Sequence, residues 1–180
     1  EGASGKPFAR YWLHNNMVTV GGQKMGKSLG NFITLQDAFK KWDPMVLRLF
    51  ILQSHYRSPL DFSDEALGAA KSGYERLLIL RGRLAGHAKL WSGGAKPSRP
   101  ANDIDFVQAA RRRFMEAMDD DFNTSSALAE VFTLATATNS YFDKPGQMIP
   151  EHAVSSIIYA FEDMAGTILG LTFAGSQAAA

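Results

Sequence analysis

Hydrophobic positions in the second half of the chain recur at the spacing of α-helices. Three stretches, near residues 104–118, 128–142 and 154–171, each place apolar residues along one helical face, and turn-forming or capping residues separate them. Each stripe is wide enough to pack against a neighbouring helix. This half of the chain therefore predicts an antiparallel helical bundle.

The first half predicts a short β element followed by helices. Residues 17–20 form a β-type run, and Gly21 and Gly22 end it as a turn. Three helices are expected to follow, over residues 35–42, 44–53 and 64–91, each after a residue with a capping side chain: Thr34, Asp43 and Ser63. The predicted fold class is mainly α, with a short β element and a loop ahead of the helices and the bundle.

A stretch rich in glycine, proline and serine divides the chain. Residues 92–102 show no apolar periodicity and predict a linker between residues 1–91 and a bundle over residues 103–180. With 180 residues, of which 46% are hydrophobic, the chain can bury a core without disulfides or metal ions.

Charge is distributed unevenly between the two halves. The net charge is +1, but residues 1–90 carry +6 and residues 91–180 carry −5, so the first half suits a phosphate-rich partner. Because cysteine is absent, a disulfide framework, a thiolate zinc site and a cysteine nucleophile are excluded within these residues. No apolar run is long enough for a membrane span, and we expect a soluble, cytoplasmic protein.

Residues 21–28 match the phosphate-loop pattern G-x-x-x-x-G-K-S. A phosphate loop of this kind passes from a buried parallel strand directly into a helix. Here Ser28 is followed by Leu-Gly-Asn-Phe, which starts a helix poorly, and the required alternation of strands and helices is absent. The sequence therefore argues against a P-loop nucleotidase.

The same residues resemble a different motif. Lys24-Met-Gly-Lys-Ser28 is similar to the Lys-Met-Ser-Lys-Ser signature of class I aminoacyl-tRNA synthetases, with Gly26 where that family usually has serine. Four further blocks resemble the cysteine–tRNA ligase family and occur in the order in which that family has them: residues 11–18, 28–32, 55–60 and 117–124. The resemblance covers about the first 170 residues.

The resemblance implies that Lys24 and Lys27 are catalytic, with Lys27 contacting ATP and with Met25, Gly26 and Ser28 completing the ATP-binding loop. Activating cysteine with ATP expels pyrophosphate, and mobile ammonium groups can meet the negative charge that develops on it. The implied reaction forms cysteinyl-adenylate and transfers cysteine to tRNA(Cys). Its substrates are ATP with Mg²⁺, L-cysteine and tRNA.

His55, Tyr56 and Arg57 form the candidate tRNA contact, because they pair stackable rings with a guanidinium. A purely structural corner is the alternative interpretation. The three aspartates at 119–121 lack the ligand spacing of a calcium loop. We expect them to end one helix, with Asn123 or Thr124 capping the next.

The family also has a nucleotide-binding sheet domain and a zinc site, and neither is found in this sequence. We expect the chain to be a piece of a longer protein that begins after the zinc-binding region and is inactive alone. We expect no metal ligands in this piece, and the parent protein is expected to be a monomer. Two alternatives stay open: a cysteine:sugar-amine ligase, which uses no tRNA, and a stand-alone helical RNA-binding or adaptor domain. The Asp-Asp-Asp-Phe-Asn-Thr block favours the tRNA enzyme.

Overall fold

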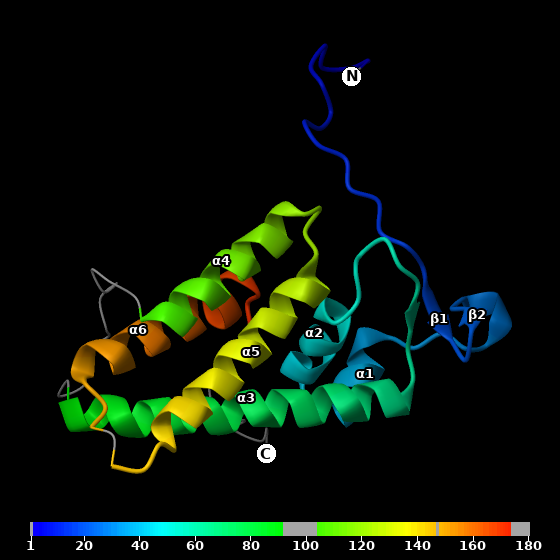
Figure 1. Ribbon diagram of the computed structural model, residues 1–180. Coiled ribbons are helices and arrows are strands. Elements are labelled where there is room, and N and C mark those ends of the chain that lie inside the picture. Colours follow the sequence, from blue (N-terminus) through cyan, green and yellow to red (C-terminus); the bar gives the residue numbers. More distant parts are fainter. Residues whose placement is uncertain (1, 92–103, 147, 174–180) are drawn as a thin grey trace.

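The computed structural model describes residues 2–91, 104–146 and 148–173 (Figure 1). In chain order the elements are β1 (Val18–Val20), β2 (Gln23–Lys24), α1 (Leu35–Lys41), α2 (Pro44–Leu52), β3 (Leu60–Asp61), α3 (Asp64–Trp91), α4 (Asp105–Asp119), α5 (Thr124–Phe142) and α6 (Glu151–Phe161). The mainly α fold class with a short β element is confirmed. The predicted linker, residues 92–102, lies outside the described residues, as does residue 103, the first of the predicted bundle.

Four helices begin where the sequence places a capping side chain. The side-chain oxygens of Thr34, Asp43, Ser63 and Asn123 each accept a hydrogen bond from a backbone N–H two or three residues later, at 3.1, 2.7, 3.3 and 3.1 Å. Each bond satisfies an N–H that has no partner inside the helix. The starts of α1, α2, α3 and α5 are therefore local properties of the chain.

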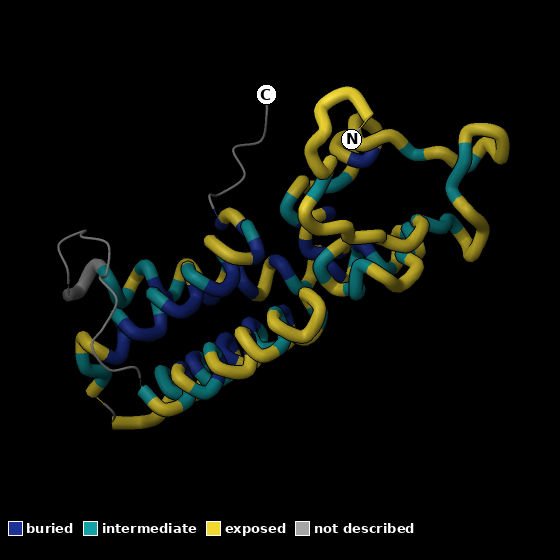
Figure 2. Tube along the Cα trace, turned by 90° about the horizontal axis from the view of Figure 1, so that it is seen from above, coloured by how far each residue is buried: buried dark blue, intermediate teal, exposed yellow. Residues whose placement is uncertain are grey.

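The helices bury their apolar stripes against one another. α4 and α5 form a helical hairpin, α2 packs on α3, and α6 contacts α3, α4 and α5. Figure 2 shows the buried residues on the facing sides of the helices. The largest of the fully buried side chains come from several helices and from the segment after α6: Leu49, Leu67, Leu77, Phe114, Leu134, Ile157, Phe161 and Leu171. Within the described residues, every helix is too short or too polar to span a lipid bilayer.

The last helix differs from the sequence prediction. The apolar pattern predicted one α-helix to about residue 171. In the structure the α-helix α6 ends at Phe161, and the chain then forms a π-helical segment, Glu162–Ile168. Leu169 N–H donates to the Met164 carbonyl at 3.1 Å. Arg48 Nε of α2 donates to the Leu169 carbonyl at 2.7 Å, so the wide turn is fixed from another helix. A tertiary contact of this kind has no signal in the periodicity of the segment itself.

A small sheet lies beside α1, away from the bundle (Figure 1). β1 pairs antiparallel with β2, with Val20 opposite Gln23, and parallel with β3, with Val18 opposite Leu60. Gly21 and Gly22 connect β1 to β2 with φ of 59° and 75°. Those angles suit a tight hairpin turn, which confirms the predicted turn. β3 was not predicted, because two residues carry no recognisable strand pattern.

Candidate functional site

The signature loop, residues 24–28, projects from the sheet. Lys24 is the last residue of β2, and Lys27 and Ser28 are exposed in a 3-10 turn, Lys27–Leu29. Gly30 ends that turn in the left-handed region, at φ 68°. Because glycine adopts this conformation without strain, the chain can reverse immediately after the turn. Both predicted catalytic lysines are therefore exposed to solvent, one at the end of β2 and the other in the turn that follows it.

Met25 anchors the signature loop. Its backbone N–H donates to the Val18 carbonyl at 3.0 Å, which ties the loop to β1. Its half-buried side chain lines an apolar cavity of about 170 Å³ together with Ile33 and Phe50. Met25, one of the predicted ATP-binding residues, is therefore fixed at the base of the loop, and residues 26–28 lie beyond it.

Gly26 stands where the family usually has serine. Its backbone is extended, with φ −164° and ψ 145°, a conformation that any residue adopts. A Cβ added there would meet only Ser28 Oγ, at 3.9 Å. The geometry of the loop therefore does not require glycine at this position, since a Cβ fits without moving its neighbours.

Lys27 has an aromatic contact. Its Nζ lies 5.5 Å from the centre of the Phe32 ring. A cation–π contact at an exposed site is worth about 0.5–1 kcal/mol, so a phosphate group would readily displace it. The contact holds the ammonium near the loop without burying it.

Asp61 of β3 fixes the turn that precedes the signature loop. One carboxylate oxygen, Oδ1, accepts hydrogen bonds from Thr19 Oγ1 at 2.6 Å and from the Gly22 N–H at 2.9 Å. These bonds, that from Thr19 above all, lower the pKa of the Asp61 carboxyl below its ordinary value. Sequence reasoning missed this residue, because its role depends on the pairing of β3 with β1.

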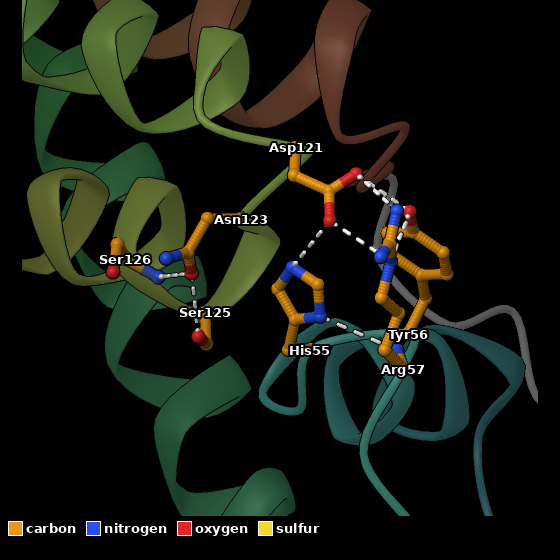
Figure 3. Close-up of polar contacts among 7 residues, drawn as sticks. All are labelled: His55, Tyr56, Arg57, Asp121, Asn123, Ser125 and Ser126. Carbon is orange, nitrogen blue, oxygen red and sulfur yellow. Dashed lines mark hydrogen bonds and ion pairs between the residues drawn. The ribbon is translucent and has the colours of Figure 1, made fainter. Parts of the chain in front are cut away.

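The three predicted tRNA-contact residues converge on one carboxylate (Figure 3). Tyr56 Oη donates to Asp121 Oδ1 at 2.6 Å. Arg57 binds the same carboxylate twice, from Nε to Oδ2 at 2.9 Å and from Nη2 to Oδ1 at 3.2 Å. His55 Nε2 lies 3.9 Å from Oδ2. We call these four residues the Asp121 cluster.

Asp121 therefore does more than the sequence predicted. It follows the end of α4 as expected, and Asn123 caps α5 as expected. Asp121 and Phe122 also have consecutive left-handed φ values, 54° and 52°, which non-glycine residues adopt rarely. Backbone bonds hold this corner, among them Asn123 N–H to the Ala117 carbonyl at 3.1 Å. The corner carries Asp121 away from the bundle and toward residues 55–57.

The charge of Arg57 is already paired in this structure. The hydrogen bond with Tyr56 and the charge of Asp121 raise the pKa of the Arg57 guanidinium further above its ordinary value. The side chains of Arg57 and Asp121 are 65% and 43% exposed, so solvent screens the ion pair. Such an exposed pair contributes little to stability, so an incoming anion can compete with Asp121 for Arg57.

Asn16 links the two candidate sites. Its backbone N–H donates to the Tyr56 carbonyl at 2.8 Å, and its Nδ2 donates to the Arg57 carbonyl at 2.7 Å. Asn16 leads into β1, which pairs with both β2 and β3. The signature loop and the Asp121 cluster are therefore positioned by the same small sheet.

The described residues do not provide the ligands of a zinc site. Within the described part of the chain, no three His, Asp or Glu side chains converge as metal ligands, and the sequence contains no cysteine. We therefore assign no step of the reaction to a protein-bound metal.

Comparisons with known proteins cover both parts of the structure. Residues 1–72 match a family model described as the tRNA synthetases class I (C) catalytic domain. Residues 113–174 match a model described as the DALR domain. The first match contains the signature loop and residues 55–57 of the Asp121 cluster, and the second contains Asp121.

Curated relatives agree with the two models. The chain is 45% identical over 171 residues to a cysteine--tRNA ligase of Chlorobaculum tepidum, covering 95% of this chain and 32% of the relative. It is 43% identical to a cysteine--tRNA ligase of Heliobacterium modesticaldum, covering 97% of this chain and 37% of the relative. It is 53% identical to one of Rippkaea orientalis, covering 75% of this chain and 27% of the relative. The chain thus spans about a third of the length of these relatives. With both family models in the order that the sequence blocks indicated, the chain is similar to about a third of the length of cysteine--tRNA ligases, and its first part matches the class I tRNA synthetase catalytic domain.

Proposed function

We propose that this chain supplies the signature loop and the helical bundle of a cysteine–tRNA ligase. The ligase forms cysteinyl-adenylate and pyrophosphate from ATP and L-cysteine, then transfers cysteine to tRNA(Cys) with release of AMP. The observation that carries the proposal is the exposure of Lys24, at the end of β2, and Lys27, in the following 3-10 turn, on a loop that Met25 ties to β1 and that follows a turn held by Asp61. The names of the relatives support cysteine as the amino acid.

The two lysines have a defined task in this reaction. The carboxylate of cysteine attacks the α-phosphorus of ATP, and the bond to the bridging oxygen of pyrophosphate breaks. Negative charge grows on the departing pyrophosphate, with Mg²⁺ bound as part of the nucleotide substrate. Ammonium groups on a loop can follow that charge as it moves, and Lys27, in the exposed turn, is the principal donor.

The activity is tested with the full-length ligase, meaning a ligase of the relatives' length that contains these residues. We expect cysteine-dependent ATP–pyrophosphate exchange and cysteinylation of tRNA(Cys), but no transfer to an amino sugar. The 180-residue chain alone should fold without catalysing exchange, because relatives named as ligases are about three times as long. We propose a cytoplasmic monomer, which light scattering of the ligase would check. Exchange without tRNA charging would contradict the proposed acceptor.

We also propose that residues 55–57 contact tRNA. The rings of His55 and Tyr56 are stacked, with centroids 4.8 Å apart, and Arg57 lies beside them. A phosphate that displaces Asp121 could bind the Arg57 guanidinium in the orientation that the carboxylate now holds. The two rings offer a stacking surface for an unpaired base.

Replacing Arg57 by alanine is expected to weaken tRNA binding by the full-length ligase and to reduce the salt slope of the binding constant by about one, the value of a single phosphate contact. Arg112→Ala is the matched control, because Arg112 is also exposed and paired with an acid, Glu116 at 3.7 Å. Filter-binding titrations at several salt concentrations decide the question. Equal slopes for the two variants would mean that Arg57 is only structural.

A further inference from the structure

Asn31 lies where the chain returns to the base of the signature loop. The 3-10 turn ends at Gly30, and Asn31 is the next residue. The reversal at Gly30 brings the Asn31 side chain back against the start of the loop. Asn31 is half-buried, whereas Lys27, Ser28 and Leu29 are exposed.

The Asn31 carboxamide joins the two arms of the loop. Its Oδ1 accepts a hydrogen bond from the Gly26 N–H at 2.9 Å, and its Nδ2 donates to the Lys24 carbonyl at 3.2 Å. Lys24 and Gly26 flank Met25, whose own N–H is bound to β1. Three consecutive residues at the base of the loop are therefore held, two of them by one side chain.

The chemistry of this contact requires an amide. One partner is a donor and the other an acceptor, and a carboxamide supplies both groups from one planar unit. A carboxylate could still accept from Gly26 but would face the Lys24 carbonyl with a second oxygen. It would also place a negative charge between Lys24 and Lys27, where it would compete with phosphate for their ammonium groups.

We propose that Asn31 is a positioning residue for adenylate formation, which fixes the base of the signature loop so that Lys24 and Lys27 meet the developing pyrophosphate charge. This inference rests on the proposed function of the two lysines. Because Gly26 allows the loop backbone more freedom than a serine would, the hydrogen bonds of Asn31 are needed to restrain the two arms. Asn31 itself contacts no reacting atom.

The test compares Asn31→Ala and Asn31→Asp in the full-length ligase, with Gln36→Ala, an exposed polar residue of nearby α1, as the control. We expect Asn31→Ala to slow single-turnover adenylate formation by about 5- to 30-fold, the factor that corresponds to one or two hydrogen bonds. The dissociation constant of ATP and the transfer of cysteine from preformed adenylate should stay nearly unchanged. Asn31→Asp should also slow adenylate formation.

Hydrogen exchange gives a second measurement. The Gly26 amide should exchange faster in Asn31→Ala but stay protected in Asn31→Asp, while the Met25 amide, bound to Val18, stays protected in both. If Asn31→Ala formed adenylate as fast as Gln36→Ala while Lys27→Ala was slow, the positioning role would be wrong and the proposed function would stand. If Lys27→Ala were also fast, the proposed function of the loop would fail. Equal losses in adenylate formation and transfer, with a lower melting temperature, would mean a merely structural role and overturn the proposal.

Discussion

Replacing Lys27 by alanine in the full-length ligase is expected to slow adenylate formation by about 100- to 1000-fold, with little effect on cysteine binding. The Lys27 ammonium matters most when charge develops on pyrophosphate, so its loss raises the barrier rather than the energy of the bound substrates. Its exposed position in the 3-10 turn leaves it free to reach that charge. Pre-steady-state measurement of adenylate formation tests the effect.

Lys24→Ala and the transfer step provide the comparisons. Lys24 ends β2 and its carbonyl is held by Asn31, so its loss should act in the same direction but less strongly. Transfer of cysteine from preformed adenylate to tRNA should be nearly unaffected in both variants, since pyrophosphate has already left. If Lys27→Ala slowed only the transfer step, the loop would serve tRNA and the assignment to ATP would be wrong.

Replacing Phe161 by alanine is expected to lower the free energy of unfolding of the 180-residue chain by about 3–5 kcal/mol. The Phe161 side chain is fully buried at the end of α6, and its ring lies 5.0 Å from that of Phe173. Removing it takes apolar surface out of the core and leaves a cavity that α3 and α6 cannot close without moving. Urea unfolding followed by far-ultraviolet circular dichroism measures the change.

Ile79→Ala is the control for the loss of apolar side-chain atoms. Ile79 lies on α3 but is 72% exposed, so its replacement should change the free energy of unfolding by no more than about 0.5 kcal/mol. If the two variants unfolded at the same urea concentration, the burial of Phe161 between α6 and its neighbouring helices would be contradicted.

The candidate site was only partly readable from the sequence. The signature loop is contiguous, so its lysines and glycines could be identified together with their flanking blocks. The Asp121 cluster joins residues 55–57 to a residue more than sixty positions later, and no local pattern indicates that contact. Asp61 was missed for the same reason, since its hydrogen bonds exist only once β3 lies beside β1.

What the sequence determined by itself is the set of elements whose causes are local. Capping side chains and 3.6-residue periodicity place α1, α2, α3 and α5 within a residue or two, because both effects act over one or two helical turns. Tertiary structure alone decided the parallel strand β3, the π-helical end of α6 and the convergence of residues 55–57 on Asp121. Each of these depends on a hydrogen bond or ion pair between segments far apart in the chain. Capping and helical periodicity act within one or two turns, so they carry no information about such contacts.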